Sequence, residues 1–405
     1  MRLALGLTAY AFYVQAIGGL AAPFLAREFG LGDAAITAIA GWVSVGAFGT
    51  ALLTRLADRH GRRGMLLVCF ALLPLLSLTS ALAPDVASYT ASQIAVNAVL
   101  GALLAALVVV IAEGATDSRR AAGQAWVGLV GAIGAGPALA LAAGADRLPF
   151  GWRTFWAVAA LPALAIPSVW SAFTETERFA RARDLGRVAS SRAADLFHGP
   201  LRRRSIGLLV VSFLRPMALI AVGTWPFYHM VKTLSLSPPV ASLVYLIGGG
   251  IGQVGHPLGA RLSNRWGRRP TSLAGSIVAV ATGLLFFWVA PGPWERLELI
   301  ALMALSQGAT AAFSVSDRLL GVELFPTPLR ATFAGASALM LAAAAVASQF
   351  GLSLLSARLG GLVPAITWLS LATFVPATAV FLLVVPETRG LSLEQASLEE
   401  ESAAA

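Results

Sequence analysis

Long apolar runs recur along the whole chain, and short polar stretches separate them. A helix of about 20 apolar residues crosses the roughly 30 Å hydrocarbon core of a bilayer. The runs lack the strict alternation of barrel strands, and a lipid-exposed backbone has to satisfy its own hydrogen bonds. The pattern therefore predicts an all-α membrane protein with twelve transmembrane helices, at residues 3–26, 34–54, 65–83, 89–112, 122–143, 153–173, 206–231, 240–260, 271–290, 299–321, 332–355 and 363–385.

Composition supports a chain that resides in lipid. Of its 405 residues, 57% are hydrophobic and 12% are charged, which is about half the charged share of an ordinary soluble domain. The apolar run after Met1 and Arg2 resembles a secretory signal, but it is long for one, so we expect it to be the first helix. Cys69 is the single cysteine, so the sequence has no disulfide framework.

Arginine is distributed unevenly among the loops that join these helices. Of the 29 basic residues, only Lys232 is not an arginine. Loops on one side, including 174–205, hold most of them, and the positive-inside rule makes that side cytoplasmic. We therefore expect a multi-pass protein of the inner cell membrane with cytoplasmic N- and C-termini. The basic residues are scattered over many short loops, which argues against nucleic acid as a partner.

Three polar landmarks occur twice, once in each half of the chain. They are an arginine-rich phrase, a glutamate seven residues before an arginine, and a polar stretch that follows the last helix of each half. In pairs they are TRLADRHGRRG (54–64) and ARLSNRWGRRP (260–270), Glu113…Arg120 and Glu323…Arg330, and TETER (174–178) and PETRG (386–390). Parallel repeats of this kind are typical of two-bundle secondary transporters.

The repeats predict the domain organisation. The longest hydrophilic stretch separates six predicted helices from six. We expect an N-terminal six-helix bundle at 1–173, a cytoplasmic central loop at 174–205, a C-terminal six-helix bundle at 206–385 and a cytoplasmic tail at 386–405.

With these motifs the chain resembles the major facilitator superfamily, in particular its sugar-porter and metabolite:proton-symporter branches. The resemblance covers the whole chain, and it implies a two-bundle fold that moves small molecules by alternating access, with neither an enzymatic activity nor a cofactor. The matching residues are Asp58-Arg59-x-Gly61-Arg62-Arg63, the two Glu…Arg pairs above, Glu175…Arg178, ELFPTPLR at 323–330 and PETRGLSLEQ at 386–395.

The sequence departs from the family pattern in four places. Thr54 replaces a glycine four places before the aspartate of the first arginine phrase, and Gln93 and Asn97 stand where helix 4 usually carries an arginine motif. The predicted first helix has no acidic residue, and helix 7 lacks the paired glutamines of sugar porters. These departures argue against a sugar as the substrate and against the usual site of proton coupling.

Charged side chains near the cytoplasmic helix ends form the predicted gate. In alternating access, the two bundles have to be held together at one face of the membrane in one state and separate there in the next. A guanidinium suits this role because it stays charged and binds a carboxylate through two hydrogen bonds. Asp58 becomes Asn264 in the second copy, so we assign the charge-dependent part of the lock to the first copy. The alternative is that the arginines only fix topology. The gating candidates are Asp58, Arg59, Gly61, Arg62, Arg63, Glu113, Arg120, Glu175, Arg178, Asn264, Arg265, Gly267, Arg268, Arg269, Glu323, Arg330, Glu387 and Arg389.

Of the ionisable residues in the predicted spans, two clearly lie inside the membrane, Arg215 and Asp317. A charge there costs about 2.5–3.5 kcal/mol on insertion scales, so each is a functional candidate. We expect Arg215 to hold a substrate anion, Asp317 to carry any coupled proton, and Pro216 to open the helix locally. The alternative is a structural pair of Asp317 with Arg215 or Arg318. Further pathway candidates, each of which could instead join helices, are Tyr13, Gln15, Gln93, Asn97, Trp225, Tyr228, Gln253 and His256.

The sequence predicts no catalytic or metal site. The four histidines show no metal-ligand spacing, and no Walker A motif is present. We expect proton-linked transport of a small metabolite, an organic anion, by a monomer in the lipid bilayer. Export of amphipathic compounds, sugar transport and a transporter-like sensor remain open alternatives.

Overall fold

The computed structural model describes residues 2–60, 62–114, 120–172, 193–199, 201–390 and 395. Within these ranges, the side chains of residues 2, 55–60, 62, 109, 112–114, 120–129, 132, 171–172, 193–194, 322 and 327–328 lie outside the description. All regular structure in the described part is helical, which confirms the predicted all-α class. Contacts group the chain into two compact units, Met1–Val188 with Phe227–Ser242, and Ala189–Pro226 with Leu243–Ala405.

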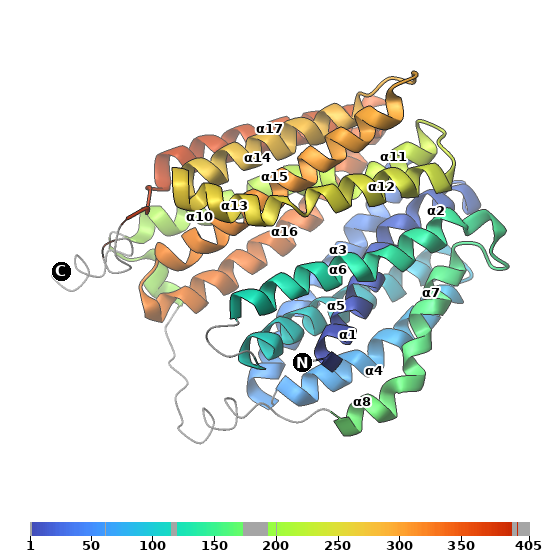
Figure 1. Ribbon diagram of the computed structural model, residues 1–405, viewed down its shortest axis with the longest axis horizontal. Coiled ribbons are helices and arrows are strands. Elements are labelled where there is room, and N and C mark those ends of the chain that lie inside the picture. The colour runs from blue at the N-terminus through green and yellow to red at the C-terminus, as the bar shows by residue number, and fades with distance from the viewer. Residues whose placement is uncertain are drawn as a thin grey trace. The chain divides into compact units, whose positions relative to one another are not determined.

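The first unit contains the N-terminal helices and a short segment from the second half of the chain. Its elements are α1 (Arg2–Leu20), α2 (Ala22–Glu28), α3 (Asp33–His60), α4 (Arg62–Ala81), α5 (Val86–Gly114), α6 (Arg120–Ala143), η2 (Ala145–Arg147), α7 (Arg153–Ala160), η3 (Leu161–Ala165), α8 (Ile166–Ala172) and, from Phe227 onward, α11 (Pro226–Lys232). Within it, α5 packs on α3, α4 and α1, while α1 packs on α6 (Figure 1).

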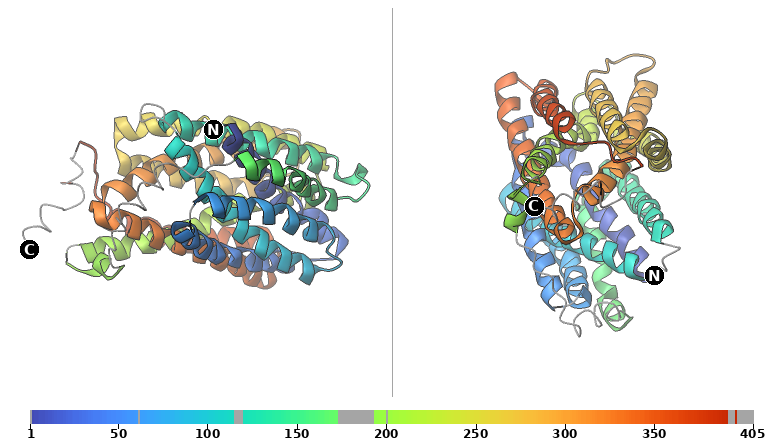
Figure 2. Two further views of the ribbon diagram at one scale, coloured as in Figure 1. Left: turned by 90° about the horizontal axis from the view of Figure 1, so that it is seen from below. Right: turned by 90° about the vertical axis from the view of Figure 1, so that its left-hand side faces the viewer.

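The second unit contains the remaining helices. They are η4 (Ala193–Phe197), α10 (Leu201–Thr224), α13 (Gly255–Trp266), α14 (Arg268–Phe287), α15 (Glu295–Glu323), α16 (Thr327–Leu359) and α17 (Leu362–Val384), and α12 (Pro238–Gly252) enters this unit at Leu243. Here α14 lies beside α15, and α10 packs on α16 and α17 (Figure 1 and Figure 2). A core cluster joins α10, α15, α16 and α17, in which the rings of Phe325 and Phe333 stack 3.9 Å apart.

Nine helices in the described ranges are long and apolar enough to cross a membrane. Three predicted spans are not among them. The span predicted at 122–143 contributes only the shorter apolar helix Ile133–Ala143. The span at 153–173 is divided into α7, η3 and α8, and the span at 240–260 is divided into α12 and α13. The number of twelve spans therefore stays a prediction.

Prolines stand beside two of the helix interruptions. Proline has no N–H group, and its ring clashes with the carbonyl group four residues earlier. Pro226 follows the end of α10. Pro257 lies in the first turn of α13, four residues after Gln253, which is in the turn between α12 and α13. Pro216 lies inside an unbroken α10, so the prediction that it opens the helix was wrong. The interruption comes instead at Trp225, immediately before Pro226.

Glycines allow a very close helix crossing in each unit. In the second unit, a Cβ added to Gly255 of α13 would lie 2.0 Å from the carbonyl oxygen of Gly308 on α15. In the first unit, a Cβ added to Gly46 of α3 would lie 2.3 Å from the carbonyl oxygen of Ile94 on α5. Small residues let helix backbones approach closely in a membrane, where packing drives association. Both repeats therefore contain the same kind of backbone contact.

Glu28 and Arg153 together join three segments of the first unit. Nη1 of Arg153 donates to both of its carboxylate oxygens, at 2.6 and 2.7 Å, and the Trp152 indole donates to one of them at 2.6 Å. Nη2 of Arg153 also donates to the carbonyl oxygen of Ala83 at 3.1 Å. Burial raises the pKa of Glu28, but the hydrogen bonds from Arg153 and Trp152 together outweigh it and hold that pKa below its usual value.

We expect Gly255→Ala to destabilise the protein, because the added methyl group has to push α13 away from α15. Overpacking of this kind costs about 1–3 kcal/mol. Gly249→Ala is the matched control, since a Cβ there meets no atom within 4 Å. Thermal unfolding of both purified variants in one detergent measures the difference. Equal midpoints would show that the crossing tolerates a side chain.

The Glu28 contacts should make stability depend on pH on the acid side. Because the folded-state pKa is lowered, the stabilisation is complete above the pKa of the unfolded chain and is lost as the pH falls through the folded-state pKa. Between about pH 6 and pH 3, wild type should therefore lose more thermal stability than Glu28→Gln, which cannot titrate there. Unfolding midpoints of both proteins across this range provide the measurement, and parallel curves would contradict the expectation.

Candidate functional site

The two ionisable residues predicted inside the spans meet in the second unit. Arg215 on α10 donates from Nη2 to Oδ2 of Asp317 on α15. Nη1 of Arg215 donates to the hydroxyl oxygen of Ser272 on α14 at 3.2 Å. That hydroxyl in turn donates to Oδ1 of Asp317. The Arg215–Ser272–Asp317 triad is thus a closed set of hydrogen bonds that joins three helices.

Two phenyl rings flank the cation of the triad. The guanidinium carbon of Arg215 lies 5.5 Å from the ring centroid of Phe313 and 5.2 Å from that of Phe381. Aromatic faces attract a cation at this distance. The side chain of Arg215 is 11% exposed and that of Asp317 is 27% exposed. The carboxylate is therefore the more accessible member of the pair.

The predicted amide pair on α5 makes bonds between helices. Nε2 of Gln93 donates to the hydroxyl oxygen of Ser80 on α4 at 2.8 Å, and Gln93 is buried. Nδ2 of Asn97 donates to the carbonyl oxygen of Val43 on α3 at 3.0 Å. These side chains join α5 to α4 and to α3 inside the first unit.

The two candidates on α1 differ in their surroundings. Tyr13 is buried, and its hydroxyl donates to the carbonyl oxygen of Phe155 on α7 at 2.7 Å. Gln15 is exposed on the surface of α1. Tyr13 therefore ties two helices of the first unit together, whereas Gln15 is accessible for a contact outside it.

The remaining pathway candidates lie near helix interruptions. The Trp225 indole donates to Oε1 of Gln349 on α16 at 3.2 Å, and the Tyr228 hydroxyl donates to Oδ1 of Asp33 at 2.8 Å. Gln253 and His256 are exposed at the turn between α12 and α13. Trp225 and Tyr228 are thus each bound to another helix within their own unit.

Among the gating candidates, Glu387 has the most contacts in the described part of the second copy. Its carboxylate accepts hydrogen bonds from the backbone N–H groups of Arg268 and Arg269, at 3.0 and 3.1 Å, at the N-terminus of α14. A carboxylate is favourable there because it binds unpaired N–H groups and the positive end of the helix dipole. Gly267 has φ 110°, and a Cβ on it would lie 2.4 Å from the Glu387 carboxylate. Glycine is therefore needed at this position for two reasons.

Glu323 at the end of α15 extends this network. It pairs with Arg268 at 3.3 Å, and Oγ1 of Thr388 donates to its other carboxylate oxygen at 2.5 Å. Arg269 instead donates to the carbonyl oxygen of Leu382, at 2.6 Å, and Arg330 to that of Phe325, at 3.0 Å. Asn264, Arg265 and Arg389 are exposed at the same end of the unit's helices.

Most of the first-copy candidates lie outside the described side chains. They are Asp58, Arg59, Gly61, Arg62, Glu113, Arg120, Glu175 and Arg178. Arg63 is described, and its Nη2 donates to the carbonyl oxygen of Trp170 at 3.2 Å. The assignment of the charge-dependent lock to Asp58 therefore stays a prediction.

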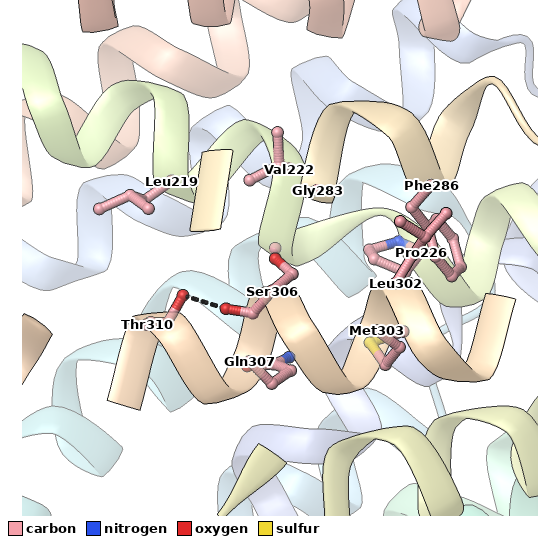
Figure 3. A pocket seen from close by; sticks show the side chains of 11 residues that line it. Leu219, Val222, Pro226, Gly283, Phe286, Leu302, Met303, Ser306, Gln307 and Thr310 are labelled. Atoms are coloured by element: carbon pink, nitrogen blue, oxygen red, sulfur yellow. Dashed lines mark hydrogen bonds between the residues drawn. The ribbon is translucent and has the colours of Figure 1, made fainter. Parts of the chain in front are cut away.

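The structure adds a cavity of about 70 Å3 in the second unit, which sequence reasoning missed. Figure 3 shows its lining from α10, α14 and α15 together with Pro226, and this lining is apolar except for Ser306, Gln307 and Thr310. The Ser306 hydroxyl donates to the carbonyl oxygen of Ala279 at 3.0 Å, and the Thr310 hydroxyl donates to that of Ser306 at 2.8 Å. Gln307 follows Asn97 at the same interval at which Glu323 follows Glu113, so the repeat itself was a signal for it.

The described residues contain no group of three or more histidine, cysteine or acidic side chains that could hold a metal ion. Sequence reasoning also missed Ser272, Phe313 and Phe381 around Arg215. Serine and phenylalanine are common in apolar helices, so only the helix packing reveals these three contacts.

Known proteins share this architecture. A D-xylose–proton symporter structure aligns with a TM-score of 0.68 and 21% identity, over 96% of this chain and 98% of that one. The nucleoside transporter NupG aligns with a TM-score of 0.73 and 14% identity, over 95% of this chain and 100% of that one. A human steroid transmembrane transporter is 28% identical over 200 residues, a match that spans 49% of this chain and only 33% of that relative.

A family model covers most of the sequence. The model described as "Major Facilitator Superfamily" matches residues 3–349. The match agrees with the doubled motifs and with the solved structures of the same fold. The chain therefore belongs to the Major Facilitator Superfamily and is a multi-pass membrane transporter of small molecules.

Proposed function

We propose that the protein couples the movement of protons to that of a small organic anion, and that the Arg215–Ser272–Asp317 triad performs the coupling. The observation that carries this proposal is the pairing of a largely buried guanidinium with a more accessible carboxylate inside an apolar bundle. Ionisable groups within membrane helices are costly, and they mark ion and proton paths in transporters.

Coupling follows from the need of Arg215 for an anion. Removing one partner of a buried ion pair costs about 3–5 kcal/mol, because the other charge is left unpaired. A proton on Asp317 neutralises the carboxylate that pairs with Arg215. A carboxylate of the substrate then takes the place of that charge, since a guanidinium binds carboxylates in a forked geometry. Proton and anion thus bind together, and loss of the proton expels the anion.

Known relatives support parts of this proposal. The aligned D-xylose–proton symporter is a proton symporter by its name, so this fold supports proton coupling. The proposed gate also belongs here: the network of Arg268, Glu323 and Glu387 would keep the helix ends of the second bundle together while the bundles rock. The arginine-rich loops favour an inner-membrane protein with both termini in the cytoplasm.

A neutral, hydroxylated solute is the second candidate. The cavity lined by Ser306, Gln307 and Thr310 offers hydrogen-bonding groups without charge. The aligned structures are named for a sugar and for nucleosides, which are polar solutes of this kind. In that case the triad would be a structural pair, and transport would depend on Gln307 rather than on Arg215.

Asp317→Asn should abolish uptake driven by a pH gradient and leave exchange of substrate across the membrane in place. Asparagine keeps the size and a hydrogen bond to Arg215 but cannot bind and release a proton. Uptake and counterflow in proteoliposomes, with a panel of carboxylates and neutral polyols, measure both activities. Gln307→Ala is the comparison variant, and gradient-driven uptake equal to wild type in Asp317→Asn would refute the coupling role.

Substrate affinity should fall in the order wild type, Arg215→Lys, Arg215→Ala. Lysine keeps the charge but loses the fork, so we expect a loss of about tenfold, against more than about a hundredfold for alanine. Binding of the transported carboxylate to each purified variant gives the values. Affinities that do not change in either variant would leave the triad as a structural pair and would favour the neutral solute.

A further inference from the structure

Arg318 stands next to the triad on α15 but is not a member of it. It follows Asp317 directly, so its side chain leaves the helix about 100° away from that carboxylate. Both oxygens of Asp317 are engaged, one by Arg215 and the other by Ser272. Arg318 is exposed and makes no ion pair within the described residues. A cation within an apolar helix is costly and is normally paired, so Arg318 needs an anion.

A second basic side chain faces Arg318 from the neighbouring helix. α13 crosses α15 closely at Gly255 and Gly308, and His256 follows Gly255 in the first turn of α13. His256 is exposed, and it is close enough to Arg318 for their charges to interact. Two basic groups thus share one exposed surface of the second unit, and no acidic side chain in the described part pairs with either of them.

The first repeat shows that helix packing requires neither basic residue. At the offsets of the duplicated motifs, Val108 matches Arg318 and Thr50 matches His256. The helix crossing is the same in both repeats, so it tolerates an uncharged side chain at both places. Water near the end of α15 can solvate the long side chain of an arginine, but that does not call for a second basic group beside it. An anion bound between the two groups accounts for both.

We infer that Arg318 and His256 form a second anion site, which binds a second carboxylate of the transported solute, so that the solute is a dicarboxylate. The inference rests on the proposed function, in which Arg215 receives the first carboxylate once Asp317 is protonated. A guanidinium binds a carboxylate through two hydrogen bonds, and the imidazole of His256 adds a donor beside it. The second carboxylate thus supplies the anion that Arg318 does not find in the protein.

The spacing of the two cations sets the length of the solute. The divergence of Asp317 and Arg318 places the guanidinium groups of Arg215 and Arg318 about 10–14 Å apart when the side chains are extended. Each ion pair takes up about 4 Å of this distance. The carboxylate groups of the solute are then about 2–6 Å apart, as in unbranched dicarboxylates of about four to six carbons. Ser314, one turn before both Asp317 and Arg318, makes the surface between them polar.

The test compares probes of equal length that differ by one charge. Adipate has a carboxylate at both ends and hexanoate has one, and succinate and butyrate form a shorter pair. Binding to the purified protein in nanodiscs of zwitterionic lipid is measured by isothermal titration calorimetry, with empty nanodiscs as the blank. Wild type should bind the dicarboxylate of at least one pair about fivefold more tightly than its partner, the upper end for one exposed ion pair.

Arg318→Gln should remove this preference, so that both probes of a pair bind alike, and its binding of the monocarboxylate shows that it is folded. Arg318→Lys keeps the charge and should retain part of the preference. His256→Thr, which introduces the residue of the first repeat, should lose part of it. Arg261→Gln is the matched control and should keep the whole preference. It also removes one exposed arginine of α13, five residues after His256 and about 140° around the helix.

The second anion site is refuted if wild type binds both probes of each pair alike, or if the preference survives in Arg318→Gln. It is also refuted if Arg261→Gln loses the preference, because the effect is then one of overall charge. A preference that disappears when anionic lipid is added would assign the site to a lipid headgroup instead of the solute.

Arg215→Ala separates this inference from the proposed coupling. Hexanoate and butyrate should bind this variant much more weakly than wild type. Unchanged binding would refute the role of the triad, whereas the second anion site is judged by the difference between two probes in the same protein. Failure of all four probes to bind wild type would contradict an organic anion as the solute, and with it both proposals.

Discussion

Lipid provides no hydrogen-bond partner, so each bundle has to satisfy its polar atoms internally. In the first unit, Gln93 does so through Ser80 on another helix, and Tyr13 through a carbonyl oxygen of α7. In the second unit, Arg215 and Asp317 satisfy each other across α10 and α15. Each bond also fixes the rotation of two helices about their axes, since the polar atoms meet in only one orientation. The same requirement that makes a polar residue costly therefore makes the bundle rigid.

The two repeats keep one backbone contact and vary the chemistry beside it. Gly46 and Gly49 face α5, and Gly252 and Gly255 face α15, at the same spacing that separates the two arginine-rich phrases. On the opposing helices, Asn97 and Gln307 occupy matching places in the two repeats. The amide of Asn97 donates a hydrogen bond to α3, whereas the longer side chain of Gln307 lines the cavity. The helix crossing is thus the same in both repeats. Gln307 is longer than Asn97 by one methylene group, and the two amides make different contacts.

The features that depend on local sequence, such as the helical class, could be predicted. The contacts between helices that are distant in the sequence could be predicted only in part. The length and spacing of the apolar runs predicted the all-α fold, because the thickness of the bilayer and the rise of a helix per residue determine how long each run has to be. The pairing of Arg215 with Asp317 was among the alternatives, because a buried cation needs an anion and few are present. Ser272 and the two rings around Arg215 depend on helix rotation, which an almost uniformly apolar helix does not encode. The interruption at Pro226 was missed because Pro216, closer to the charge, seemed the better candidate.

The network at the start of α14 places a carboxylate next to the second arginine-rich phrase, in which Asn264 stands where the first phrase has Asp58. The N-terminus of a helix attracts a carboxylate, and here Glu387 supplies it by binding the N–H groups of Arg268 and Arg269. Asn264 is exposed and brings no charge of its own. The polar stretch after α17 therefore supplies the negative charge at the start of α14, and the second arginine-rich phrase itself supplies none.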